Sequence, residues 1–145
     1  MLQRNDLGPQ LAERGLVHSM TDVTGFGLAG HLLEVVRASG LAATLDLTKV
    51  PTYNPERLRE LYQQFCLPNL TTTNYRAVQA DCSSMDGFTM AQLCDPQTSG
   101  GLLLFVAPNQ ATAVAQLLEE LGLPFSPIGQ VIAATEGSPL LELRT

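Results

Sequence analysis

Apolar residues recur along the chain at helical spacing in some segments and alternate as strand residues do in others. Between Leu28 and Val36 they follow a helical period, and Gly40 is well placed to end that helix. Residues 42–47 (AATLDL) alternate between apolar and polar, whereas residues 102–107 (LLLFVA) form an unbroken apolar run. The pattern therefore predicts a helix followed by a strand and, later in the chain, a buried strand.

Capping residues predict two further helices. Asn54 is suited to cap a helix that has Pro55 at its first position. Asn109 is expected to cap another, which ends at Gly122. The apolar face of the first consists of Leu58, Leu61, Tyr62 and Phe65, and that of the second of Val114, Leu117, Leu118 and Leu121.

The remaining segments are shorter or more polar. Residues 68–84 are rich in threonine and predict mostly loop with one short strand. Residues 129–135 and 139–144 predict two strands that the EGS sequence between them joins as a hairpin. Short helices are also predicted at residues 6–15 and 88–93, with an extended segment at residues 16–23.

Helices and strands thus mix without strict alternation, which predicts an α+β protein, a layered α/β sandwich with a mixed sheet. A length of 145 residues is typical of one domain, and we find no internal repeat and no second domain. Residues 1–145 are therefore expected to form a single domain.

Composition narrows the classes of function. The 45% hydrophobic and 15% charged residues are typical of a globular domain, and the formal charge is −6 with no basic stripe. This charge disfavours nucleic acid and an anionic membrane surface as partners. No apolar run reaches the length of about 18 residues needed to span a bilayer. The three cysteines, Cys66, Cys82 and Cys94, form no metal-binding or disulfide pattern, which favours reduced thiols in a cytoplasm.

Residues 22–31 (DVTGFGLAGH) carry the spacing G-x-G-x-x-G at Gly25, Gly27 and Gly30. A dinucleotide site would use this turn, with Asp46 as the acid that binds the ribose. Two features weigh against it, because the preceding segment is polar and the Asp22 carboxylate would repel a pyrophosphate beside it.

If a divalent cation is present, the negative charge of Asp22 no longer weighs against a phosphate site, because the carboxylate can bind the cation. Mg²⁺ takes one or two protein carboxylates and completes its shell with water and phosphate oxygens. The backbone N–H groups around Thr24 to Gly27, at a helix N-terminus, suit a phosphate. The alternative is that Asp22 or Thr24 only caps the helix while the glycines allow close packing.

Residues 95–101 (DPQTSGG) form a second candidate, directly before the apolar run. Hydroxyls and bare backbone at Thr98, Ser99, Gly100 and Gly101 suit an anion-binding nest, and they equally suit an ordinary turn. No Ser-His-Asp or Cys-His arrangement has a local signature, and His18 and His31 are expected to be structural. Lys49 is the single lysine, so the chain has too few groups for phosphotransfer on its own.

Three segments together resemble signature sequences of the selenophosphate synthetase (selenide, water dikinase) family. They are HSMTDVTGFGLAGHLLEV from His18, DPQTSGGLLL about 70 residues later, and the closing FSPIGQV. The resemblance covers most of the chain, from about residue 1 to residue 131. It places the chain in the superfamily of aminoimidazole ribonucleotide synthetase-like ATP-dependent enzymes, as the C-terminal domain. It implies the layered α/β fold of that domain, with partial ferredoxin-like topology.

The resemblance also implies an activity: selenide, ATP and water give selenophosphate, orthophosphate and AMP, with Mg²⁺ required. This reaction supplies selenium for selenocysteine biosynthesis, and the family suggests a cytoplasmic homodimer. Asp22 matches the family's magnesium ligand. Thr24, Gly25 and Gly27 are implied to line the phosphate site, and the segment containing Ser99, Gly100 and Gly101 is implied to be structural or to line the cleft.

The family's reactive cysteine or selenocysteine, catalytic lysine and other metal-binding aspartates lie in an N-terminal ATP-binding domain that residues 1–145 lack. The chain alone is therefore expected to be inactive and to need that domain as a partner. Residues 68–78 replace a family loop of the type G-G-T-x-x-N, keeping Asn74 but losing the glycines. Two alternatives stay open: a non-catalytic structural or interaction domain of the same fold, and a fragment of a purine-pathway relative.

Overall fold

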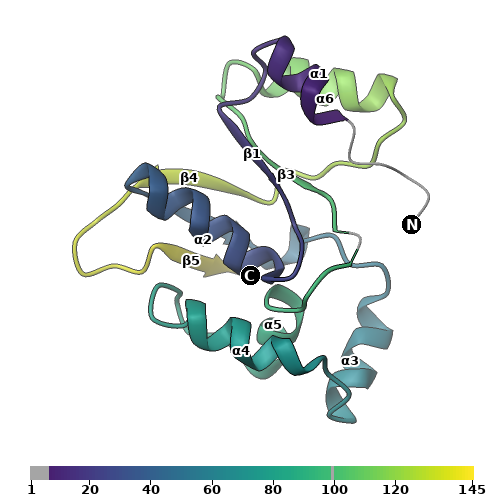
Figure 1. Cartoon of the computed structure of the whole chain (residues 1–145), viewed down its shortest axis with the longest axis vertical. Helices are drawn as coiled ribbons and strands as arrows, with labels where there is room; N and C mark the ends of the chain where they lie inside the picture. The colour runs from purple at the N-terminus through teal and green to yellow at the C-terminus, as the bar shows by residue number, and fades with distance from the viewer. Residues whose placement is uncertain (1–6, 99) are drawn as a thin grey trace.

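The computed structural model describes residues 7–98 and 100–145. Within them, six α-helices and five strands surround two apolar clusters (Figure 1). The helices are α1 (Leu7–Glu13), α2 (Gly27–Ser39), α3 (Pro55–Gln63), α4 (Asn69–Val78), α5 (Gly87–Leu93) and α6 (Ala111–Glu120). The strands are β1 (Ser19–Asp22), β2 (Leu41–Asp46), β3 (Leu102–Phe105), β4 (Gly129–Ala133) and β5 (Leu141–Arg144).

The strands form two small sheets. In one, β2 is central, with β4 antiparallel on one side and β5 parallel on the other. In the other, β1 pairs antiparallel with β3, from Ser19 opposite Phe105 to Asp22 opposite Leu102. The first sheet is mixed, and the α+β prediction with a mixed sheet is confirmed.

Two apolar clusters hold these elements together. The larger lies between α2, the mixed sheet and α5, and includes the fully buried side chains of Leu33, Leu45 and Leu141. The smaller joins α1 to α6 through residues such as Leu11 and Leu117. In Figure 1, α1 and α6 lie together at one end of the molecule, and the β1–β3 ribbon leads from them to the start of α2. Asp22, at the end of β1, therefore lies at the edge of the larger cluster.

Several local predictions are confirmed. Helix α2 ends at Gly40, whose φ of 65° is left-handed, and β2 follows directly. The Asn54 side chain accepts a hydrogen bond of 2.9 Å from the Arg57 backbone N–H at the start of α3. Each of these features depends on neighbouring residues alone, which explains why the sequence pattern reveals them.

Helix α4 replaces the loop predicted at residues 68–84, so that prediction is wrong over most of its length. The helix buries Thr71, Asn74 and Val78, which lie at helical spacing. Two of these three residues are polar, so the segment carries no apolar stripe. Their burial depends on contacts with segments distant in the sequence.

Three further predictions need correction. The strands β4 and β5 form no hairpin, because both pair with β2, which separates them. Asn109 does not cap α6: the capping position is Gln110, without a side-chain bond, because residues 107–110 form a turn first. The apolar run at β3 is only partly buried, since β3 pairs on one side with β1 alone.

The predicted apolar face of α3 is confirmed in part: Leu58, Leu61 and Tyr62 are half-buried, whereas Phe65 lies past the end of the helix and is 91% exposed. After the helix, the Phe65 N–H donates to the Tyr62 carbonyl and the Cys66 N–H to the Leu61 carbonyl, a Schellman arrangement. It requires the left-handed φ of 55° at Phe65, where a Cβ is strained.

Phe65→Gly is therefore expected to raise the free energy of unfolding by about 1 kcal/mol, because glycine removes the strain of about 1–2 kcal/mol and adds a smaller entropic cost. Urea denaturation measures the change. The matched control is Phe65→Ala, which keeps a Cβ and should give no gain. An equal gain from both variants would contradict the explanation.

Candidate functional site

Asp22 is the last residue of β1 and its side chain is exposed. The next residue, Val23, is 8% exposed and belongs to the larger apolar cluster, whereas Thr24 is exposed again. The exposure of Asp22 and Thr24 on either side of the buried Val23 follows the alternation of an extended chain. Among the described residues, Asp22 forms no ion pair. Its charge is therefore open to a ligand.

The glycine-rich turn continues directly into α2. The Gly27 N–H donates to the Thr24 carbonyl at 3.1 Å, and α2 begins at Gly27. The capping position is Phe26, which makes no side-chain capping bond among the described residues. Neither Asp22 nor Thr24 therefore caps the helix, so the capping part of that alternative is wrong, although the close packing that it expected is present at Gly27. The N-terminal end of α2 keeps its partial positive charge toward the surface.

Gly27 has a φ of +71°, and a Cβ there would lie 2.7 Å from the Leu93 carbonyl oxygen. The turn therefore packs its backbone directly on the end of α5, and the segment after α5 is the second candidate motif.

Backbone hydrogen bonds join the two candidate motifs. The Val23 N–H donates to the Gly101 carbonyl at 3.0 Å, and the Gln97 N–H donates to the Thr24 carbonyl at 3.0 Å. A Cβ on Gly100 would lie only 2.0 Å from the Val23 carbonyl oxygen, so the two backbones touch. Ser99 lies outside the described residues. Asp22 and Gly101 are thus neighbours in space although they are far apart in the sequence.

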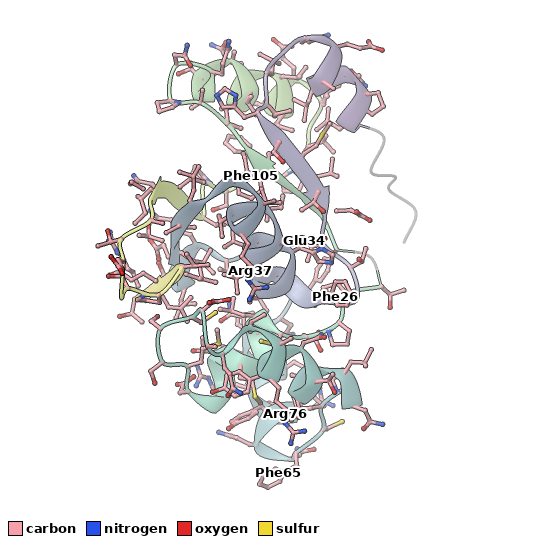
Figure 2. The ribbon with its side chains drawn as sticks, turned by 60° about the vertical axis from the view of Figure 1, so that its left-hand side comes forward. Phe26, Glu34, Arg37, Phe65, Arg76 and Phe105 are labelled. Atoms are coloured by element: carbon pink, nitrogen blue, oxygen red, sulfur yellow. The ribbon has the colours of Figure 1, made fainter. Side chains whose placement is uncertain are left out.

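His31 lies beneath this surface and is 6% exposed. Its Nε2 is 3.1 Å from the Thr24 Oγ1, and its Nδ1 is 3.5 Å from a Glu34 carboxylate oxygen. Figure 2 shows Phe26 and Glu34 on the same side of α2, and the Phe26 ring centroid is 5.5 Å from that of His31. The histidine therefore orients the Thr24 hydroxyl. His18 is exposed, with its backbone N–H bonded to the Phe105 carbonyl at 2.8 Å.

A third segment reaches the site from α4. The Asn74 Nδ2 donates to the Gly25 carbonyl at 2.8 Å and to the Cys94 carbonyl at 2.9 Å. Asn74 is the residue that the resemblance matches to the asparagine of the family loop, but nothing in its local pattern predicts either contact. The site therefore comprises three segments rather than two.

Burial raises the pKa of Asp95, the first residue of the second motif, while the Gln97 side chain lowers it through a hydrogen bond of 2.9 Å. Asp95 is partly buried and shares that hydrogen bond, which is consistent with a structural place in the turn. Asp22 is thus the exposed carboxylate where the motifs meet.

The side chains near Asp22 fit a metal site that this chain shares with another domain better than a metal site that it forms alone. Within residues 7–98 and 100–145, no group of three or more His, Cys, Asp and Glu side chains could hold a metal ion. Asp22 fits as the single carboxylate that this chain would contribute, since Mg²⁺ often takes one or two carboxylates and fills its shell with phosphate oxygens and water.

Two thiols have a raised pKa: Cys94 is buried next to the site, and Cys82 is half-buried beside Leu141. Burial raises the pKa of Cys82 to about 12 and that of Cys94 to about 11. A raised thiol pKa in the folded state stabilises the fold fully below the unfolded value, about 9, and this contribution is lost as the pH rises above it.

The free energy of unfolding should therefore fall between about pH 8 and about pH 10, because unfolding lets both thiols ionise. Urea denaturation at the two pH values measures the fall. The exposed Cys66 provides the control, since Cys66→Ser should keep the fall unchanged. A double Cys82→Ala, Cys94→Ala variant should reduce it, and an undiminished fall in that variant would contradict the assignment.

The geometry is that of one exposed carboxylate beside two glycine-rich segments. A family model described as "AIR synthase related protein, C-terminal domain" matches residues 1–141. The chain belongs to this family. The superfamily expected from the sequence motifs is thereby confirmed.

Curated relatives of the chain are named selenide, water dikinase. The proteins from Aeromonas salmonicida and Aeromonas hydrophila are each 41% identical over 143 residues, which are 99% of this chain and 41% of each relative. The protein from Colwellia psychrerythraea is 40% identical over 139 residues, 96% of this chain and 39% of that protein. The chain thus spans about 41% of the length of the relatives from Aeromonas.

A solved structure supports the fold. The crystal structure of thiamine-monophosphate kinase from Stenotrophomonas maltophilia matches with a TM-score of 0.57 and 24% sequence identity, over 94% of this chain and 34% of that one. Among the helices that the structure describes, none has the length and apolar character needed to cross a membrane.

Proposed function

We propose that this chain acts as the C-terminal domain of a selenophosphate synthetase, which makes selenophosphate, AMP and orthophosphate from selenide, ATP and water. The observation that carries the proposal is the meeting of the two motifs at Asp22, in a chain 41% identical to proteins named selenide, water dikinase. Those relatives are more than twice as long as the matched segment, which supports a partner domain.

In this proposal the chain completes a site that an N-terminal ATP-binding domain begins. The Asp22 carboxylate is a ligand of Mg²⁺, which would neutralise phosphate charge during the transfer. Thr24, Gly25 and Gly27 line the phosphate region, with the N-terminal end of α2 stabilising negative charge. Gly100 and Gly101 line the same phosphate region, whereas the expected role of Ser99 falls outside the described residues.

The contacts of Thr24 and Gly100 support their proposed places in the site. The Thr24 hydroxyl lies 3.1 Å from the Nε2 of His31, and this contact fixes the Thr24 side chain in the turn that follows Asp22. The close contact of Gly100 with the Val23 carbonyl leaves no room for a side chain, so the backbone of the second motif lies directly against the turn that follows Asp22. The reactive nucleophile and the cationic groups belong to the partner domain. We further propose a cytoplasmic homodimer.

A chimaera tests this function. The chain would replace the matched 143 residues of the Aeromonas salmonicida relative, behind the N-terminal part of that protein. Selenide-dependent formation of AMP from ATP should appear with the chimaera and not with the N-terminal part alone. A folded chimaera that makes no AMP would overturn the proposal.

The same chimaera separates the two alternatives. If the chain is a non-catalytic domain of this fold, Asp22 can be replaced without loss of activity. If it belongs to a purine-pathway enzyme, the chimaera should turn over a purine-pathway substrate and not selenide. Our proposal predicts the opposite result in both cases.

A further inference from the structure

The side chain of Asn74 joins the two motifs of the site from a helix that contributes no other group to it. It is 7% exposed, and its amide nitrogen donates both of its hydrogen atoms, to the Gly25 carbonyl at 2.8 Å and the Cys94 carbonyl at 2.9 Å. One carbonyl lies in the turn after Asp22, and the other directly precedes Asp95. A single buried amide therefore ties the metal-ligand turn to the second motif.

The bond to Gly25 fixes the direction of a whole peptide unit. A trans peptide is planar, and its C=O and N–H groups point in opposite directions. The Gly25–Phe26 peptide is trans, and its carbonyl points to the buried Asn74. The N–H of Phe26 must then point the other way. Phe26 is 62% exposed and stands at the N-terminal end of α2.

Packing alone does not explain this residue. A buried amide adds nothing to an apolar core unless its hydrogen bonds are needed, and an apolar side chain would fill the same space. Thr71 lies on the same buried face of α4, three residues earlier, and is 0% exposed. Its hydroxyl has no hydrogen-bond partner among the described residues. The two positions thus share burial but differ in their connection to the site.

We propose that Asn74 is a positioning residue, which holds the Gly25–Phe26 peptide so that the Phe26 N–H faces a phosphate group of the nucleotide beside the cation of Asp22. This inference rests on the proposed function, because it assigns the direction of a backbone donor in that site. Asn74 touches no reacting atom. It acts through the turn whose carbonyl it holds.

The first test measures the peptide itself in the 145-residue chain. In ¹⁵N-labelled protein, Asn74→Ala should shift the Phe26 amide resonance strongly or split it into several conformers, because the carbonyl loses its donor. Thr71→Val, an isosteric change on the same helix face, should leave that resonance in place. An unmoved Phe26 resonance in a folded Asn74→Ala protein would overturn the inference. Asn74→Ser, which keeps one donor, replaces Asn74→Ala if the latter does not fold.

The second test uses the chimaera and the Michaelis constant for ATP. Asn74→Ala should raise this constant about tenfold or more, with a much smaller change in kcat, because a ground-state contact to phosphate is lost. Thr71→Val should change neither value. A loss of thermal stability with an unchanged Michaelis constant would show a merely structural role and overturn the inference.

The two tests separate this inference from the proposed function. A parent chimaera that makes no AMP would refute the function, and the orientation of the Phe26 peptide would still be decided by the resonance in the chain. An active parent with an unmoved Phe26 resonance would refute the role of Asn74 and leave the function standing.

Discussion

Replacing Asp22 with asparagine in the active chimaera is expected to lower selenide-dependent AMP formation about a hundredfold or more. Asparagine keeps the shape of the side chain but removes the charge that would bind Mg²⁺, and metal ions contribute several kcal/mol of charge stabilisation to phosphoryl transfer. Because Asp22 is exposed and has no ion-pair partner within the described part of the chain, stability should barely change. The initial rate and the thermal midpoint together measure both effects.

The control for this prediction is Glu136→Gln, which removes one exposed negative charge on the connection between β4 and β5. It should leave the rate unchanged, which separates a specific ligand from a general effect of charge. A raised Mg²⁺ concentration should restore part of the activity of Asp22→Asn. Full activity of that variant at ordinary Mg²⁺ would remove Asp22 from the metal site.

Replacing Gly27 with alanine is expected to lower the free energy of unfolding by about 3 kcal/mol or more. A left-handed φ strains a residue with a Cβ by about 1–2 kcal/mol, and overpacking adds about 1–3 kcal/mol. Both apply here, since φ is +71° and the Cβ would lie 2.7 Å from the Leu93 carbonyl oxygen. Chemical denaturation of the chain measures the loss.

Gly25 offers a matched control in the same turn. A Cβ there meets nothing within 4 Å, and its φ lies outside the left-handed region, so Gly25→Ala should change stability by less than about 0.5 kcal/mol. Similar losses at both glycines would show that the turn responds to any side chain. The close contact at Gly27 would then not explain the loss of stability.

The candidate site could be predicted from the sequence only as separate pieces. Asp22 and the glycine-rich turn stand out because a carboxylate can bind Mg²⁺ and the backbone N–H groups at a helix N-terminus can bind a phosphate. The ion-ligand role of Asp22 and the lining roles of Thr24, Gly25, Gly27, Ser99, Gly100 and Gly101 stay predictions. What no local pattern indicates is that the Val23 N–H and the Gly101 carbonyl are hydrogen-bonded, since such a pairing depends on the folding of all the residues between them.

Helix α4, whose buried positions are partly polar, shows most clearly what the sequence pattern could not predict. Its buried positions are occupied by Thr71 and Asn74, so an apolar-periodicity argument finds no helix there. A buried amide is tolerable only where partners satisfy it, and those partners are carbonyls of two distant turns. The contact that makes the residue reasonable is therefore invisible until the chain is folded.

The sequence by itself determined those features that depend on near neighbours. These are the helix that ends at Gly40, the Asn54 cap, the strand at β2, and the two motifs that indicate the family. The tertiary structure decided which segments meet: β4 and β5 on opposite sides of β2, α4 beneath the turn, and the second motif beside Asp22. The physical reason is that caps and periodicity act over a few residues, whereas strand pairing and buried hydrogen bonds join groups that the chain brings together only when its apolar faces pack.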